Sequence, residues 1–454
     1  MIGSQEWSVN QAASSSSSSS SQPFVPPTFS SLPSAVSTFG APAHLLAQYT
    51  SQPPTNLSLK KLLSLSPTTT TPPSQAQVHE SALFTSQELP IRMARRVASF
   101  RSLPFIVGAN PHIGRVARLY AESFEILANW SDRLRKGGEG EEERFVELLR
   151  QLVERHRDNI PDLARGFLEC KKYMSPAALS AFLDEAIHSR IGIRLIAEQH
   201  LALASNYFRQ GVSYQATGYN PSRSSIAAST SRLTAMTSAG GTIHTDLSPY
   251  DVLKHVEKGV SALCQSTLGQ APQLLIEGHI DATYVGVPVH LEYVLTELLK
   301  NSFRANVERS QKLREEEVRP VKVTIAKSRR HISLRIRDRG GGIHPRDLDR
   351  VFSYAFTTAG REPGSDEANS VDEAGPYSIQ ATAGGGGGLT ALGASGLQSS
   401  LGTLAGLGYG LPMARIYATY FGGGSEMAVV SLWGEGCDAF VRLPRDPRGE
   451  GGMP

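Results

Sequence analysis

The hydrophobic pattern divides the chain into two parts with different periods. Between residues 84 and 204, apolar residues recur every three or four positions, which is typical of amphipathic helices. The expected helices are Glu88–Phe100, His112–Trp130, Glu143–Arg155 and Pro176–Leu203, with a charged loop at Lys136–Glu141. Several long helices with short connections predict an antiparallel bundle.

From about residue 248 onward, one helix is followed by segments in which apolar and polar residues alternate. This alternation is typical of strands. The expected elements are a helix at Tyr250–Leu268, strands at Gln273–Glu277, Thr283–Val287, Val321–Ile325, Ile332–Arg337, Met427–Trp433 and Cys437–Leu443, and a helix at Pro412–Tyr420. The fold class is therefore expected to be α+β, with a helical bundle followed by a mixed sheet that carries helices.

The segment His290–Ala305 is expected to form one helix with two different faces. Leu291, Leu295, Leu298 and Ser302 lie at helical spacing and predict a buried face. Glu297, Asn301 and Arg304 lie at i, i+4 and i+7, so they share another face. An acid, an amide and a base on one face suit a site for a metal ion, a water and phosphates, although most such faces are simply solvated.

Low-complexity segments set the expected boundaries. Residues 1–80 are rich in Ser, Thr, Pro and Gln and are expected to be disordered, except for a short element around Leu57–Leu65. The remaining divisions are a bundle at 81–204 for partner docking and regulation, a linker or insertion at 205–247, a second domain at 248–445 and a tail at 446–454. Within the second domain, 359–404 is a long segment rich in Gly and Ala.

Composition excludes several classes of protein. The 454 residues include 45 basic and 42 acidic side chains, a formal net charge of +3, which is no bulk signature of nucleic-acid or membrane binding. Cys170, Cys264 and Cys437 are far apart and predict neither a disulfide framework nor a metal site. No apolar run approaches the length of a membrane span.

Two glycine clusters supply candidate chemistry for the second domain. A strand leads into Asp338-Arg339-Gly340-Gly341-Gly342-Ile343, where a carboxylate beside glycines could accept a hydrogen bond from an exocyclic amine such as that of adenine. The segment 405–411 (AGLGYGL) precedes a helix, whose N-terminal N–H groups suit a phosphate. The GxxxxGK[ST] phosphate loop is absent from the sequence.

The order of these features resembles the ATP-binding domain of histidine kinases, type II topoisomerases and the ninety-kilodalton heat-shock chaperone. Over residues 84–445 the chain resembles the mitochondrial 2-oxoacid dehydrogenase kinases, which phosphorylate pyruvate or branched-chain 2-oxoacid dehydrogenase on serine. The stretches that carry this resemblance are 87–92 (QELPIR), 103–108 (LPFIVG), 189–194 (SRIGIR), 297–301 (ELLKN), 338–343 (DRGGGI), 356–359 (FTTA) and 408–412 (GYGLP). The segment 103–111, the segment 356–358 and Tyr293 look closest to the branched-chain member.

The resemblance implies a set of site residues. Glu297 would be the general base or would orient the acceptor hydroxyl, Asn301 would bind Mg²⁺, and Asp338 would hold adenine. The other residues expected around ATP are Arg304, Ala305, Gly340, Gly342, Ile343, Thr357, Thr358, Gly406, Leu407, Gly408, Tyr409, Gly410, Leu411 and Cys437. Thr357 and Thr358 would also lie near a K⁺ ion, and Lys300 would either add positive charge or form a salt bridge.

The chain departs from the family pattern in three places. Cys437 replaces a threonine that usually lies near the nucleotide, so ATP affinity is in question. The lid at 359–404 is long, and the chain ends at Pro454, so the C-terminal arm that some family members exchange across a dimer is not expected.

The expected partners are the dehydrogenase component, the lipoyl-bearing acyltransferase core and a second copy of the chain, in the mitochondrial matrix. The N-terminus matches a transit peptide poorly, because its first basic residue is Lys60 and its first arginine is Arg92. Two alternatives stay open. His156, followed by Pro161, faintly resembles the phosphoacceptor box of a histidine kinase, and a scaffold with a degenerate ATP site is the non-enzymatic alternative.

Overall fold

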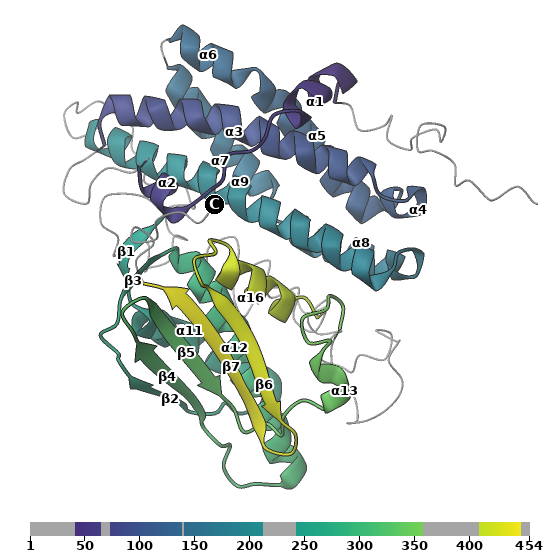
Figure 1. The fold of residues 1–454 in the computed structure, drawn as a ribbon, viewed down its shortest axis with the longest axis vertical. Coiled ribbons are helices and arrows are strands. Elements are labelled where there is room, and N and C mark those ends of the chain that lie inside the picture. The colour runs from purple at the N-terminus through teal and green to yellow at the C-terminus, as the bar shows by residue number, and fades with distance from the viewer. Residues whose placement is uncertain (1–40, 65–72, 139, 212–241, 357–407, 446–454) are drawn as a thin grey trace, which may run out of the picture. The chain divides into compact units, whose positions relative to one another are not determined.

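The first half of the chain folds as a helical bundle in the computed structural model, which describes residues 41–64, 73–138, 140–211, 242–356 and 408–445. The helices are α1 (Ala43–Thr50), α2 (Leu59–Ser64), α3 (Gln75–Arg101), α4 (Phe105–Gly108), α5 (Pro111–Ala128), α6 (Trp130–Lys136), α7 (Glu141–Arg155), α8 (Asn159–Cys170) and α9 (Pro176–Gly211), with a 3₁₀ turn at Lys171–Tyr173. Helix α3 packs against α5 and α9, α5 against α8, and α7 against α9 (Figure 1). The predicted bundle is confirmed.

The prediction that residues 1–80 are disordered is wrong for the parts of this region that the structure describes. The short element expected near Leu57–Leu65 exists as α2, but α1 and the beginning of α3 are also helical. Helix α1 buries Leu46, and the Tyr49 hydroxyl donates to the Ala128 carbonyl oxygen over 2.7 Å. A few apolar residues suffice here because the bundle supplies the rest of the core, which composition alone does not reveal.

Helix α3 extends beyond the expected limits. It begins at Gln75 rather than Glu88, because Ser74 and Gln77 form a capping box, and it continues through Pro90. Arg96 of α3 is only 1% exposed and pairs with Glu185 over 2.9 Å.

The predicted linker at 205–247 is shorter than expected. Helix α9 continues to Gly211, and β1 (His244–Leu247) pairs antiparallel with β3 (Tyr284–Gly286). Residues 212–241 lie outside the described part of the chain. The division of the chain into domains at residues 81, 205 and 248 stays a prediction.

The second half of the chain is built on a five-stranded mixed sheet with the order β2-β4-β5-β7-β6. The strands are β2 (Leu274–Gly278), β4 (Val321–Lys327), β5 (His331–Arg337), β6 (Glu426–Leu432) and β7 (Gly436–Pro444). Strands β2 and β4 are parallel, and the other neighbours are antiparallel. Alternate residues of β4 and β5, such as Val323 and Ile336, are buried, which confirms the alternation predicted for these strands.

Among the described residues, α11 (Pro249–Leu268), α12 (Pro288–Leu313) and α16 (Gly410–Thr419) are the long helices that accompany this sheet. Helix α12 contacts α11, α16, β4 and β5, and α16 contacts β6 and β7 (Figure 1). A short helix, α13 (Pro345–Leu348), follows the turn after β5. Helix α12 therefore packs on the sheet and has α11 and α16 as neighbours.

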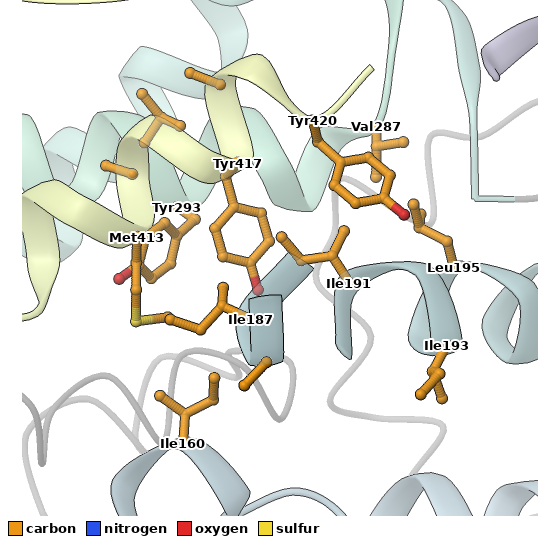
Figure 2. Packing of buried hydrophobic residues seen from close by; sticks show 14 of the residues in the cluster. Ile160, Ile187, Ile191, Ile193, Leu195, Val287, Tyr293, Met413, Tyr417 and Tyr420 are labelled. Carbon is orange, nitrogen blue, oxygen red and sulfur yellow. The ribbon is translucent and has the colours of Figure 1, made fainter. Parts of the chain in front are cut away.

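The bundle and the sheet share one buried cluster of apolar side chains. Figure 2 shows where they meet: Met413 and Tyr417 of α16 point toward Ile187 and Ile191 of α9. Tyr293 of α12 lies beside them, with its ring centroid 4.7 Å from that of Tyr417. Helix α16 thus has one side on α12 and another on α9.

We expect Tyr49→Phe to lower the free energy of unfolding by about 1 kcal/mol, because it removes the hydrogen bond between α1 and the Ala128 carbonyl group. Urea denaturation followed by circular dichroism measures this change. Unchanged stability would contradict the docking of α1 on the bundle.

Candidate active site

Helix α12 brings the predicted acid, amide and base to one face and buries the predicted apolar face. Leu291, Leu295, Leu298 and Ser302 are all at most 5% exposed. Glu297 is 6% exposed, whereas Asn301 and Arg304 are half-buried. Within the described residues Asn301 makes no side-chain hydrogen bond, and Arg304 pairs with Glu308 over 3.6 Å. A half-buried amide oxygen is thus available to a ligand.

The Glu297 carboxylate lies between a lysine and a glycine. Its Oε1 accepts a hydrogen bond from Lys300 Nζ over 2.8 Å, so the salt bridge that the sequence left as one option for Lys300 is present. A Cβ atom added to Gly410 would lie 2.2 Å from Oε2. Any larger residue at position 410 would therefore displace the carboxylate, so α16 begins directly against Glu297.

The turn after β5 packs on the same helix. A Cβ atom on Gly340 would lie 2.3 Å from the Ala305 Cβ, so only glycine allows this approach. Asp338 Oδ1 accepts hydrogen bonds from the Gly340 and Cys437 backbone N–H groups over 3.0 and 3.1 Å. Its Oδ2 accepts only from the Ser302 hydroxyl over 3.4 Å among the described residues. Burial raises the pKa of Asp338, although these donors oppose the shift.

Residues that the sequence analysis did not select hold this turn in place. Asn306 accepts a hydrogen bond from the Arg339 N–H over 2.8 Å and donates to the Arg319 carbonyl group over 2.8 Å. Ser431 accepts from the Ile343 N–H over 2.6 Å. Ser302 was predicted only as a core residue. No motif in the sequence distinguishes these polar residues, because their role depends on contacts across the sheet.

The second glycine cluster leads into α16 as predicted. Gly408 has a φ of +74°, and a Cβ atom there would lie 2.3 Å from the Phe356 carbonyl oxygen. Tyr409 is 1% exposed, and Leu411 is half-buried in the first turn of α16. Gly406, Leu407, Thr357, Thr358 and the predicted lid at 359–404 lie outside the described residues.

Cys437 lies at the edge of this site. Its N–H group binds Asp338, and its Cα is registered opposite Ser431 on β6. Burial, together with the Asp338 carboxylate, raises the pKa of the Cys437 thiol to about 11. The thiol is therefore neutral at physiological pH, and Cys437 lies beside the Asp338 carboxylate.

Comparison with known proteins assigns these two halves separately. Residues 56–223 match the family model described as mitochondrial branched-chain alpha-ketoacid dehydrogenase kinase. Residues 286–447 match the model described as histidine kinase-, DNA gyrase B- and HSP90-like ATPase.

A mitochondrial pyruvate dehydrogenase (acetyl-transferring) kinase from Arabidopsis thaliana is 30% identical over 379 residues, which cover 82% of this chain and 87% of that protein. The chain belongs to the mitochondrial 2-oxoacid dehydrogenase kinase family. The Drosophila melanogaster kinase is 28% identical over 90% of this chain and 86% of its own length. Isozyme 4 of Mus musculus is 28% identical, over 92% of this chain and 87% of its own length.

In this kinase His156 is buried in the bundle. It is 7% exposed and lies at the C-terminal end of α7. The Asn159 amide donates to Nδ1 over 2.8 Å, which leaves Nε2–H to donate to Ser123 Oγ over 2.8 Å. Burial, with the positive charge of Arg190 nearby, lowers the pKa of His156 to about 3.

A second histidine of the bundle, His200, is also buried. His200 is 0% exposed in α9, and its Nδ1 lies 3.1 Å from Ser81 Oγ. Burial lowers its pKa to about 4. Both histidines are therefore neutral packing residues in the bundle.

The pKa of His156 predicts a pH-dependent stability. Because its pKa in the folded state lies below the ordinary value of 6.5, the unfolded chain takes up the proton first as the pH falls. We expect this group to remove about 2 kcal/mol of unfolding free energy between pH 7 and pH 5. Urea unfolding at both pH values should show a smaller loss for His156→Gln than for the wild type, and equal losses would contradict this reading.

Proposed function

We propose that this kinase uses ATP to phosphorylate a serine of the dehydrogenase component of a mitochondrial 2-oxoacid dehydrogenase complex and thereby inactivates it. One observation carries the proposal. Helix α12 presents the Glu297 carboxylate and the Asn301 amide beside the Asp338 turn and the start of α16. A proton acceptor, a metal ligand and a hydrogen-bond acceptor for the adenine amine are thus available on adjoining elements.

Asp338 is assigned to the adenine base. Both of its strong backbone donors reach Oδ1, so Oδ2 keeps acceptor capacity for an exocyclic amine. Gly340, Gly342 and Ile343 would form the turn beside the base, over Ala305, and Cys437 would line the same position. Burial of Asp338 strengthens such a hydrogen bond, because little water competes for it.

Asn301 is assigned to Mg²⁺ through its half-buried amide oxygen. Among the described residues, no group of three or more His, Cys, Asp or Glu could hold a metal ion. This suits Mg²⁺, which usually takes one or two protein ligands together with phosphates and waters. Bound Mg²⁺ would neutralise phosphate charge. Arg304 and the N–H groups at the start of α16, from Gly408 to Leu411, would face the phosphates with Gly406 and Leu407.

Glu297 is assigned to the acceptor serine. It is 6% exposed, so few waters compete with a serine hydroxyl for its carboxylate oxygens. Lys300 holds Oε1, and the missing side chain of Gly410 leaves room for Oε2 at the start of α16. Glu297 would hold the serine hydroxyl and accept its proton, while most of the rate would come from positioning.

The burial of His156 weighs against the histidine-kinase alternative, because a phosphoacceptor must reach solvent and another domain. The scaffold alternative lacks support for a different reason: the described site keeps its acid, amide and aspartate. K⁺ beside Thr357 and Thr358 stays a prediction.

The partners are proposed from the family. We expect the lipoyl-bearing acyltransferase core to hold the kinase near its substrate in the mitochondrial matrix. No helix in the described residues is long and apolar enough to cross a membrane. We also expect a homodimer. Val430, Leu432 and Phe440 are exposed on β6 and β7. The neighbouring Asp438 already pairs with Arg335 and Arg337. The same apolar surface of a second copy of the chain therefore suits this sheet better than a charged partner.

Two substitutions on α12 separate binding from turnover. Asn301→Ala should abolish detectable Mg²⁺-dependent ATP binding, because it removes the proposed metal ligand. Glu297→Gln should leave the Kd for ATP within about twofold and lower kcat by about 10²–10⁴, the usual contribution of a general base. Calorimetric titration and steady-state kinetics measure the two effects. Tight ATP binding by Asn301→Ala would contradict the magnesium role.

Labelled ATP identifies the acceptor. Incubation of the kinase with the branched-chain and the pyruvate dehydrogenase components should place acid-stable label on the dehydrogenase. We expect more label on the branched-chain component, because Tyr293 and the segment 103–111 resemble that subfamily. Acid-labile label on the kinase itself would support a histidine kinase, and no label on any protein would support a scaffold.

A further inference from the structure

The proposed active site and the helical bundle meet at α16. The first residue of this helix, Gly410, touches Glu297, and Tyr417 near its end lies against Tyr293 of α12. Figure 2 shows the Tyr417 ring pointing toward Ile187 and Ile191 of α9. The same ten-residue helix therefore contacts α9 on one side and Glu297 at its first residue.

One face of α9 receives side chains from the second half of the chain. Asp184, His188 and Gly192 lie at i, i+4 and i+8, so they share this face. The Tyr420 ring lies 4.6 Å from that of His188, and a Cβ atom on Gly192 would lie 2.7 Å from the Tyr420 hydroxyl oxygen. Asp184 Oδ1 accepts a hydrogen bond from the Tyr354 hydroxyl over 2.6 Å. This bond adds a polar contact to the ring contacts on the face.

Tyr354 stands at a tightly packed junction. Two residues later, the Phe356 carbonyl group abuts Gly408, where even a Cβ atom would clash. Between them, Ala355 has a φ of +57°, a conformation that costs a non-glycine residue about 1 kcal/mol and persists only where the surroundings hold it. The Tyr354 ring also lies 5.3 Å from that of Tyr409, which directly precedes α16.

These contacts form a continuous path from α9 to Glu297. Asp184 holds Tyr354, Tyr354 packs on Tyr409, and the next residue, Gly410, touches the Glu297 carboxylate. Tyr354 is 7% exposed, so water does not replace the hydroxyl contact easily. The path does not pass through any residue assigned to adenine or Mg²⁺.

We propose that Asp184 and Tyr354 form a latch by which the bundle holds the glycine turn at residues 408–410 in place for ATP. Tyr354 is a positioning residue, because it acts through Tyr409 and Gly410 rather than by touching the reacting atoms. The inference rests on the proposed function, since the turn is assigned to the phosphates. Loss of the latch lets the turn relax, so ATP must order it on binding.

Four single variants and the double variant Tyr354→Phe/Asp184→Ala test the latch, each measured as the full chain by calorimetric titration with ATP and Mg²⁺ and by thermal unfolding. Tyr354→Phe keeps the ring and removes the hydroxyl, whereas Asp184→Ala removes the acceptor. Asp184→Asn keeps an acceptor oxygen. Tyr49→Phe is the matched control, because it removes a tyrosine hydrogen bond of similar length, 2.7 Å, within the bundle.

We expect the Kd for ATP to rise about fivefold in Tyr354→Phe and in Asp184→Ala, and no further in the double variant, because both remove the same hydrogen bond. Asp184→Asn should stay within about twofold of the wild type, and so should Tyr49→Phe despite its lower stability. A merely structural bond would lower the thermal stability of all variants and leave the Kd unchanged.

Two results would overturn the latch while leaving the proposed function intact: wild-type affinity in Tyr354→Phe, or an additive loss in the double variant. If the wild-type protein binds no ATP, that result contradicts the proposed function and the latch together. The wild-type titration therefore separates the two failures.

Discussion

Helix α12 has to satisfy two environments at once, and the rest of the structure depends on how it does so. Its apolar face is buried against α11 and the sheet, which fixes its rotation about its axis. That rotation in turn fixes where Glu297 and Asn301 point. Two close glycine contacts, Gly340 on Ala305 and Gly410 on Glu297, then bring the Asp338 turn and α16 onto the polar face. A Cβ atom at either glycine would separate these elements.

The same arrangement explains why the bundle and the ATP-binding half form one core. Helix α16 is only ten residues long, so it is stable through its packing rather than through its own propensity. One side of it contacts α12 and the other contacts α9. Because the start of α16 is also the proposed phosphate site, the helical half contributes to a site that contains none of its own residues.

Much of this could be predicted from the sequence. Helical and alternating periods located α5, α7, α11 and the strands of the five-stranded sheet within a few residues, since burial on one face produces those patterns directly. The spacing of Glu297 and Asn301 predicted their shared face for the same reason. The glycine clusters marked positions where the backbone approaches another element, and Gly340, Gly408 and Gly410 all do so.

Other features could not be predicted because they depend on contacts distant in the sequence. Helix α1 lies in a segment of low apolar content and is stabilised by Phe124 and Ala128, far along the chain. The local pattern does not distinguish Arg96 from a surface arginine, because Phe100, Phe182 and Glu185 surround it only in the folded chain. The hydrogen bonds of Asn306 leave no trace in local pattern, because a polar residue within a helix is usually solvated.

The central claim is that the polar face of α12 and its two glycine contacts form a binding site for ATP with Mg²⁺. The most direct measurement is a titration of the wild-type protein with ATP in the presence of Mg²⁺ and again in excess chelator. The account predicts saturable binding of one ATP per chain that weakens at least about tenfold without the metal, as expected when phosphate charge loses its counterion. Equal affinity in both conditions, or no binding in either, would contradict it.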